Sequence, residues 1–241
     1  MEWTDSAILL SSRPYGETGI IADLLTRDHG RHAGLVRGSK ARVLLQPGNG
    51  LSVTWRARLQ EQLGSYAVEP ARARAGSLME SREGLTGLNA FCAVALTALP
   101  EHQAHRPLYD VAEILLDAMV AGNFAHWGPL YVRWEVGLLD ALGFGLDLSR
   151  CAATGATDDL IYVSPRTGRA VAASAGADYA ARLFPLPKFL RGPGNVPDIA
   201  ATRDGLRLTG HFLLERALQP HGREMPQARH RLDALADSQL K

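Results

Sequence analysis

The chain has 241 residues, of which 46% are hydrophobic and 21% are charged. The length suits one large domain or two to three small domains, and the hydrophobic content is ample for a buried core, which excludes a disordered chain. The two cysteines, Cys92 and Cys151, are too few for a disulfide framework or a four-cysteine zinc site. The first residues are not typical of a signal peptide, and no apolar stretch reaches the roughly 18 residues of a membrane span. We therefore expect a cytoplasmic protein with no membrane partner.

The formal net charge of +1 hides a strong regional asymmetry. Residues 1–75 carry ten basic and seven acidic side chains, residues 76–150 carry four and nine, and residues 151–241 carry twelve and nine. The regional net charges of +3, −5 and +3 indicate different partners for different regions. Arginine supplies 23 of the 26 basic residues. Its guanidinium suits phosphate contacts, although a genome-wide composition bias explains the excess equally well.

The first 75 residues have the pattern of a small β-barrel. A Pro/Gly turn signal at residues 13–16 ends the first expected strand, and Pro70 ends the fifth. Gly30 can adopt a positive φ and close the hairpin between the second and third strands. Short strands in such close succession favour a barrel over an open parallel sheet. The expected strands cover residues 6–12, 19–26, 32–36, 51–59 and 66–69.

The fourth expected strand alternates strictly between apolar and polar residues. The period of two places its polar set, with Arg56 and Arg58, on the solvent face. Trp55 is therefore expected in the core and not as a base-stacking residue. For Tyr15, base stacking and packing in a turn are both open. The apolar set on the core face is Leu51, Val53, Trp55, Ala57 and Leu59.

From residue 76 onward the apolar residues recur with a helical period. The pattern predicts helices over residues 85–99, 108–119, 131–142 and 206–217. Proline or glycine ends each of them, and the last ends at Pro220. Residues 148–197 contain five prolines and many glycines, which favours loops and short strands.

A basic stretch lies between residues 27 and 42, where Asp28 is the single acid. On a small barrel it falls on a connecting loop and its flanks, where it can follow a nucleic-acid backbone. Arg56 and Arg58 would extend this surface. The alternative is a charged surface that only keeps the protein soluble. The basic residues of the stretch are Arg27, Arg31, Arg37, Lys40 and Arg42.

No motif predicts a catalytic, metal or nucleotide-binding centre. Cys151 has Thr154 where a Cys-x-x-Cys knuckle needs a second thiol, and no base is paired with it, so an enzyme that uses Cys151 is the weakest alternative. His102 and His105 lack a third ligand and are typical of a polar segment between helices. Glu135 and Asp140 do not share a helix face. We expect no enzyme activity, no metal and no cofactor.

Several blocks of the sequence resemble the RecO family of bacterial recombination mediators. They are residues 12–18 (SRPYGET), 45–49 (LQPGN), 133–139 (RWEVGLL) and 142–145 (LGFG), followed by Cys151. The blocks stand in the family's order and span nearly the whole chain. The resemblance implies an α+β fold with a five-stranded N-terminal OB-fold barrel, a helical domain and a degenerate zinc-ribbon-like insertion. The implied boundaries are 1–76 for the barrel, 77–147 for the helical domain, 148–180 for the insertion and 181–241 for a C-terminal helical segment.

The resemblance also implies a non-enzymatic role in DNA repair. Family members bind single- and double-stranded DNA, anneal complementary strands and help load the recombinase onto DNA coated with single-stranded DNA-binding protein. Implied partners are RecR and the acidic, Phe-ended tail of that coating protein, and Arg133 matches a basic position near the tail pocket. A protein–protein adaptor with only incidental DNA contact is the alternative. The expected phosphate contacts are Arg13, Arg31, Arg37, Lys40, Arg42, Arg56 and Arg58.

Overall fold

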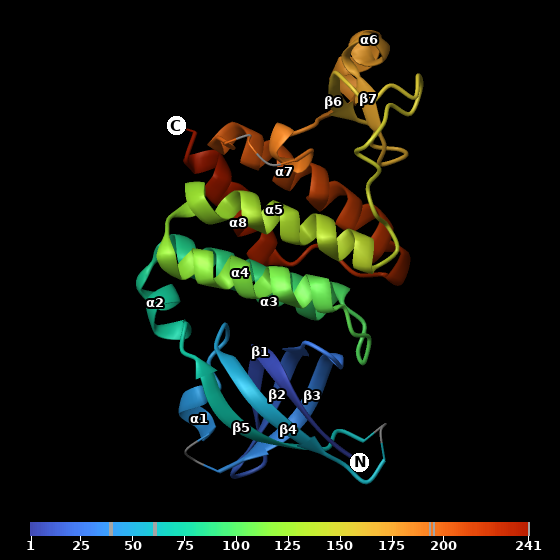
Figure 1. Cartoon of the computed structure of the whole chain (residues 1–241). Helices are drawn as coiled ribbons and strands as arrows, with labels where there is room; N and C mark the ends of the chain where they lie inside the picture. Colours follow the sequence, from blue (N-terminus) through green and yellow to red (C-terminus); the bar gives the residue numbers. More distant parts are fainter. Residues whose placement is uncertain (39–40, 60–61, 193, 195, 241) are drawn as a thin grey trace. The chain divides into compact units, whose positions relative to one another are not determined.

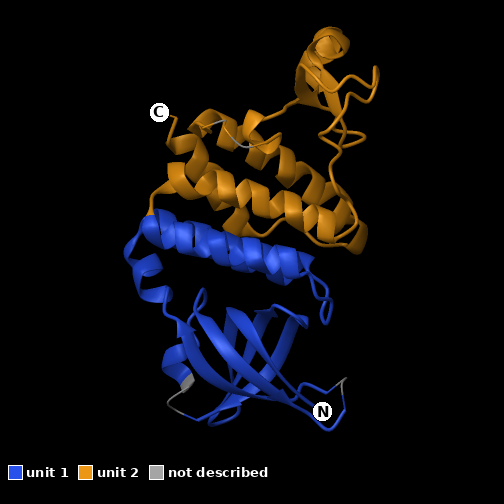
Figure 2. Ribbon diagram, viewed as in Figure 1, with its two compact units in different colours: residues 1–121 blue, residues 122–241 orange. Residues whose placement is uncertain are grey.

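The structure is a computed structural model that describes residues 1–38, 41–59, 62–192, 194 and 196–240. The chain divides into two compact units, Met1–Ala121 and Gly122–Lys241, which Figure 2 colours separately. The first unit combines a β-barrel with helices, and the second is mainly helical and carries a small sheet. This architecture confirms the expected α+β class, a five-stranded barrel followed by helices. The narrower domain boundaries at residues 76, 147 and 180 stay a prediction.

The barrel is built from strands Glu2–Tyr15 (β1), Gly19–Thr26 (β2), Gly30–Arg37 (β3), Gly50–Arg56 (β4) and Ser65–Arg72 (β5). They close in the order β1-β2-β3-β5-β4 (Figure 1). Neighbouring strands are antiparallel except β3 and β5, which pair in parallel. Antiparallel pairing brings the start of β1, the β2–β3 turn and the end of β4 to one end of the barrel. The end of β1 and the end of β3 lie at the other.

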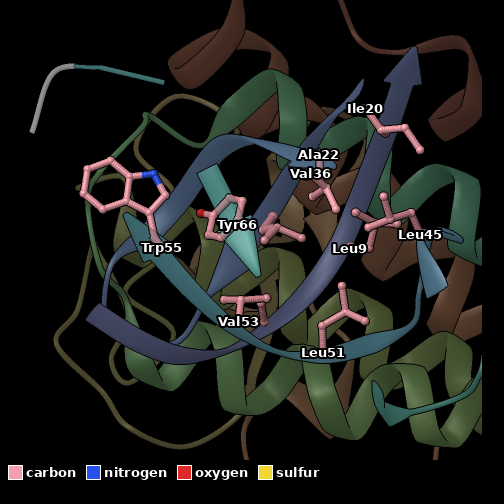
Figure 3. Packing of buried hydrophobic residues seen from close by; sticks show 11 residues of the cluster. Leu9, Ile20, Ala22, Val36, Leu45, Leu51, Val53, Trp55 and Tyr66 are labelled. Carbon is pink, nitrogen blue, oxygen red and sulfur yellow. The ribbon is translucent and has the colours of Figure 1, made fainter. Parts of the chain in front are cut away.

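Alternation along the strands fills the barrel with apolar side chains. Figure 3 shows this core, with Trp55 at one end and Ile20 and Leu45 at the other. Trp55 is 1% exposed, which confirms its predicted place on the core face. Leu59 was predicted on the same face, but β4 ends at Arg56 and Leu59 is 56% exposed. The alternation continues in the sequence beyond the point where the backbone leaves the sheet.

Two prolines predicted to end strands lie inside them instead. Pro14 pairs with Ile20, so β1 continues to Tyr15, and Pro70 pairs with Leu51, so β5 continues to Arg72. Both prolines lie where their strand pairs on one side only, because β4 leaves β1 after Ile8 and β3 leaves β5 after Tyr66. A residue without an N–H is tolerated at such an edge.

The helices of the first unit are Ala41–Leu44 (α1), Ala75–Glu80 (α2), Arg82–Ala98 (α3) and Arg106–Ala121 (α4). The side chain of Ser81 accepts a hydrogen bond from the Gly84 amide at 3.1 Å and caps α3. Helix α3 packs against β1. Arg74, only 3% exposed, donates to Asp117 at 2.7 Å and to Glu113 at 2.7 Å, and thereby ties the end of the barrel strands to α4.

The second unit is organised by helices Phe124–Ala141 (α5), Ile199–Phe212 (α7) and Gln227–Ser238 (α8). Helical backbone continues from α7 through a π-helix, Leu213–Leu218 (η3), into the turn Gln219–His221 (η4). Pro220, which was predicted to end the helix, therefore lies inside its last turn. Glu135 of α5 is fully buried and accepts from Arg229 of α8 at 2.6 and 3.0 Å. The hydroxyl of Thr209 on α7 donates to the same carboxylate. One buried carboxylate therefore joins three helices.

A small sheet in the order β7-β6-β8 occupies the Pro/Gly-rich region of the second unit. Its strands are Leu160–Val163 (β6), Ala170–Ala172 (β7) and Phe184–Pro185 (β8), with the helical segments Ala173–Gly176 (α6), Ala177–Arg182 (η1) and Lys188–Leu190 (η2) beside and after them. The Cys151 sulfur accepts a hydrogen bond from the Ala172 amide at 3.3 Å. Among the described residues no group of three or more His, Cys, Asp or Glu side chains could hold a metal ion. Cys151 therefore has too few potential ligands around it there to fit a zinc site.

Across the part of the chain that the structure describes, the helices are all too short or too polar to cross a membrane.

Candidate nucleic-acid interface

Two of the predicted phosphate contacts meet at the end of the barrel where β1 finishes. Arg13 of β1 and Arg42 of α1 line the same hollow of about 240 Å³, with Ile20 and Leu45 among its apolar walls. The hydroxyl of Ser12 donates to the Leu45 carbonyl at 3.2 Å and holds the segment after α1 against β1. This contact places Arg42 close to Arg13, although 29 positions separate them in the sequence (42 − 13).

Arg37 joins the same end of the barrel through the strand register. Gly19 pairs with both Tyr15 and Arg37, so these two residues lie in one row across β1, β2 and β3. Ile20, which follows Gly19, and Val36, which precedes Arg37, pair with each other and are buried in the core, so the row through Gly19 lies on the outer face. Tyr15 and Arg37 therefore point outward, and so does Arg13, two residues before Tyr15 on the same face. Tyr15 is 56% exposed.

These arginines are exposed, and no ion pair or hydrogen bond between described residues engages their guanidinium groups. A guanidinium without a carboxylate partner keeps its five donors for an external anion. We call this surface, formed by Arg13, Arg37 and Arg42, the cationic end of the barrel. Lys40, predicted with them, lies outside the described residues.

The other predicted contacts are not part of the cationic end. Arg56 pairs with Glu2, at the start of β1, at 2.8 Å. The mutual hydrogen bond and charge lower the pKa of Glu2 and raise that of Arg56. Arg58 is exposed just beyond the end of β4. The structure thus divides the predicted set between two ends of one barrel.

Arg31 differs from the rest because its side chain is only 15% exposed. Its Nε donates to the Leu99 carbonyl at 2.9 Å, and its Nη1 lies 3.2 Å from a Glu101 carboxylate oxygen and 3.6 Å from one of Asp23. These contacts hold the segment that follows α3 on β3. A phosphate role for Arg31 stays a prediction, and its contacts favour a structural role.

Arg133, the predicted residue for an acidic tail, is exposed on α5 in the second unit. Its Nη2 donates to the Phe189 carbonyl at 2.9 Å, and its guanidinium carbon lies 5.9 Å from the centre of the Phe189 ring. Phe189 and Lys188 line a hollow of about 490 Å³ between η2 and the start of α7. Apolar residues such as Leu186 and Pro187 line the hollow together with the carboxylates of Asp198 and Asp204, and Phe189 itself is only 2% exposed.

The two cysteines are poorly placed for nucleophilic catalysis. Burial raises the pKa of the Cys92 thiol to about 12, so it stays protonated at neutral pH. The Thr154 hydroxyl and the Ala172 amide lower the pKa of Cys151 to about 7, but that residue is only 1% exposed. A thiolate without access to substrate is not a usable nucleophile.

Known proteins resemble the chain over almost its whole length. The family model described as recombination protein O N terminal matches residues 1–74, and the one described as recombination protein O C terminal matches residues 79–224. A protein of Rhodospirillum rubrum named DNA repair protein RecO is 50% identical over 238 residues, which cover 96% of this chain and 94% of that protein.

Two further relatives carry the same name. The Cereibacter sphaeroides protein is 48% identical over 242 residues, or 98% of each chain. The Methylocella silvestris protein is 48% identical over 236 residues, covering 95% of this chain and 93% of its own length. With a barrel and a helical unit where the two family models match, the chain belongs to the recombination protein O (RecO) family of DNA repair proteins.

Proposed function

We propose that the chain binds single- and double-stranded DNA through the cationic end of its barrel. The observation that carries this proposal is the gathering of Arg13, Arg37 and Arg42 on one outward surface, without internal partners in the described part of the chain. Phosphate contacts of this kind release counterions and supply most sequence-independent affinity for nucleic acid. The membership in a DNA repair family agrees with such a ligand.

Strand annealing follows from the same chemistry. Two complementary strands repel each other through their phosphates, and a surface that neutralises phosphates lowers this repulsion. Contacts to the backbone leave the base edges free for pairing. The chain would thereby anneal strands and help load recombinase onto single-stranded DNA coated with its binding protein, with RecR as a further partner and a location at the nucleoid.

The proposed contact with the coating protein is the acidic, Phe-ended tail of that protein, bound near Arg133. The guanidinium offers a charge-assisted hydrogen bond to a carboxylate, and Pro187 and Val196 in the nearby hollow offer apolar surface to an aromatic ring. Asp198 and Asp204 line the other part of this hollow, so the acidic groups of the tail would have to lie on the Arg133 side. The cationic end belongs to the first unit and Arg133 to the second, so the two activities should be separable by mutation.

The decisive experiment reverses the charge of the cationic end. In the full chain, Arg13→Glu, Arg37→Glu and Arg42→Glu together should weaken binding of labelled single-stranded DNA at least tenfold and slow strand annealing. A matched control reverses three exposed arginines of the second unit, Arg166, Arg182 and Arg231, and changes the net charge equally. Equal affinity in both variants would favour the adaptor alternative, in which DNA contact is incidental.

A second experiment tests the tail site. Arg133→Ala should weaken binding of an acidic peptide that ends in Phe, while affinity for DNA stays unchanged. Arg133→Lys keeps the charge but loses the planar donor fork, so it should restore only part of the peptide affinity. If Arg133→Ala weakens DNA and peptide binding equally, the two sites are not separate.

A further inference from the structure

The barrel end opposite the cationic end holds a second hollow, which the DNA proposal leaves unused. Its volume is about 300 Å³, close to the lower limit of small-molecule sites. It opens where β1 begins, where β2 turns into β3 and where β4 ends. We call it the aromatic pocket, because rings form most of its wall. Its lining residues are Met1, Glu2, Trp3, Asp28, His29, His32, Trp55 and His102.

The rings of the pocket are stacked on one another. Trp3 lies almost parallel to His29, with 3.9 Å between the ring centres and 7° between the planes. The Trp3 indole also stacks on Trp55, with 5.5 Å between the ring centres and 19° between the planes. The His29 ring is fixed by Asp5, whose carboxylate lies 2.8 Å from Nδ1. Trp55 is only 1% exposed, so the part of the stack that a flat ligand can reach is formed by Trp3 and by His29, whose side chain is 35% exposed. Rings whose orientation is already fixed lose little entropy when such a ligand joins them.

His102 completes the wall from the segment between α3 and α4. Its ring stacks on His32, with 4.4 Å between centres and 27° between planes. Its φ is +62°, a left-handed value that is unfavourable for a residue with a side chain. The His102 amide donates to the Arg31 carbonyl at 2.9 Å, and the Arg31 contacts with Leu99 and Glu101 hold the flanks of the turn. The fold thus maintains a strained residue to present an imidazole.

Gly30 allows this close approach. A Cβ at Gly30 would lie 2.1 Å from the Gln103 carbonyl oxygen, so a residue with a side chain would push the segment away. Because His102 is neighbour to Gln103, the pocket wall depends on a glycine in the β2–β3 turn. The same glycine has φ +73°, which closes that turn.

The polar groups of the pocket suit a neutral flat group that donates hydrogen bonds. Burial, helped by the charge of His102, lowers the pKa of His32 to about 4, so its ring is neutral at pH 7. At the rim, the Glu2 and Asp28 carboxylates are paired with Arg56 at 2.8 Å and with Arg106 at 2.6 Å. The Met1 ammonium, which also lines the pocket, donates to the Ala57 carbonyl at 2.7 Å. Carboxylates held in this way still accept hydrogen bonds from the amino groups of bases.

We propose that the aromatic pocket accepts one unpaired nucleobase of a bound single strand. Stacking on aromatic side chains is the common way to hold a base without reading its sequence. The exposed guanidinium of Arg58, just beyond the end of β4, is available for the adjoining phosphate. This inference rests on the proposed DNA binding and extends it, because it gives single strands a contact that paired bases in a duplex do not offer.

The test compares bases with backbone. The full chain is titrated with a single-stranded oligodeoxynucleotide and with an oligomer of equal length in which every base is replaced by an abasic residue. We expect at least tenfold weaker binding of the abasic oligomer, and His102→Gly or Trp3→Leu should reduce that difference to less than threefold. Glycine suits the backbone of residue 102, so the first variant keeps its fold. His221→Gly, at an exposed histidine of the second unit, should leave the difference unchanged.

A free mononucleotide separates the two proposals. Deoxyadenosine monophosphate should perturb the indole signals of Trp3 and Trp55, whereas deoxyribose 5-phosphate should not, whatever the state of the cationic end. If both oligomers bind equally and the cationic-end variant loses both, the pocket proposal is overturned and DNA binding stands. If neither oligomer binds but the mononucleotide does, DNA binding fails and the proposed base of a bound strand is overturned, leaving a site for a free nucleotide. Perturbation by N-acetyltryptophanamide but not by the mononucleotide would assign the pocket to a protein side chain and overturn the base proposal.

Discussion

Arginine side chains lie at both ends of the barrel, but they have carboxylate partners at one end and not at the other. At the cationic end, Arg13, Arg37 and Arg42 have no carboxylate partner among the described residues. At the end that holds the aromatic pocket, Arg31 and Arg56 each pair with a carboxylate. Free arginines serve an external anion, whereas paired arginines fix loops and strand ends. The difference teaches that arginine content alone does not locate a DNA surface, because the partner of each guanidinium decides its role.

The largest effect that separates the two ends is expected from glycine. Gly30→Ala, in the β2–β3 turn beside the aromatic pocket, combines a positive φ with a clash between the new Cβ and the Gln103 carbonyl oxygen. It should lower the free energy of unfolding by about 3–4 kcal/mol, as urea denaturation would measure.

Gly16 is the matched control at the end of β1. It has φ +61°, but a Cβ added there would meet nothing within 4 Å. Gly16→Ala should therefore cost only the backbone term of about 1–2 kcal/mol. Equal losses of stability in the two variants would show that the backbone of Gln103 does not restrict residue 30.

The next largest effect depends on pH. Burial lowers the pKa of His32 to about 4 from an ordinary 6.5, so the unfolded chain takes up a proton before the folded one. The contribution of His32 to stability is complete above pH 6.5 and is lost as the pH falls towards 4. The loss should reach about 3 kcal/mol, at 1.36 kcal/mol per pKa unit.

His32→Gln removes this titration while keeping a hydrogen-bonding group. The stability difference between the original chain and the variant should therefore shrink as the pH falls from 6.5 to 4, measured by urea denaturation at each pH. Because the ordinary carboxylates titrate in both proteins, they cancel in the difference. A constant difference over this range would mean that His32 is not desolvated.

The smallest effect is expected from the exposed pair at the start of β1. Arg56→Ala removes the contact with Glu2, and the two side chains are 66% and 54% exposed. Such exposed pairs contribute little to stability, and salt screens them. Thermal unfolding at low and high salt should show a small difference between the two proteins that disappears in high salt.

Local patterns in the sequence predicted much of the fold. Alternation located β4 and the inward Trp55, and Gly30 marked the β2–β3 turn correctly. Edge pairing that sequence does not reveal allowed Pro14 and Pro70 to remain inside strands. The apolar period did not locate helix α8, although the family resemblance implied a helical segment over 181–241; besides Leu232 and Ala236, this helix buries the charged Arg229.

The candidate sites were harder to predict because their contacts are distant in sequence. Arg31 belongs to a basic run, yet its partners Leu99 and Glu101 come from the segment that follows α3, about seventy residues later (101 − 31). His102 was correctly placed in a segment between helices, but nothing local indicated its stacking on His32. In the same way, Glu135 and Arg229 are 94 positions apart. Only the tertiary structure distinguishes a paired arginine from a free one.

The most direct test of the cationic end is the salt dependence of single-stranded DNA binding. Each phosphate contact on a single strand contributes about −0.7 to the slope of log K against log salt concentration. With Arg13, Arg37 and Arg42 all replaced by Ala, we predict a slope shallower by about 2. An unchanged slope would contradict the assignment of these arginines to the DNA backbone.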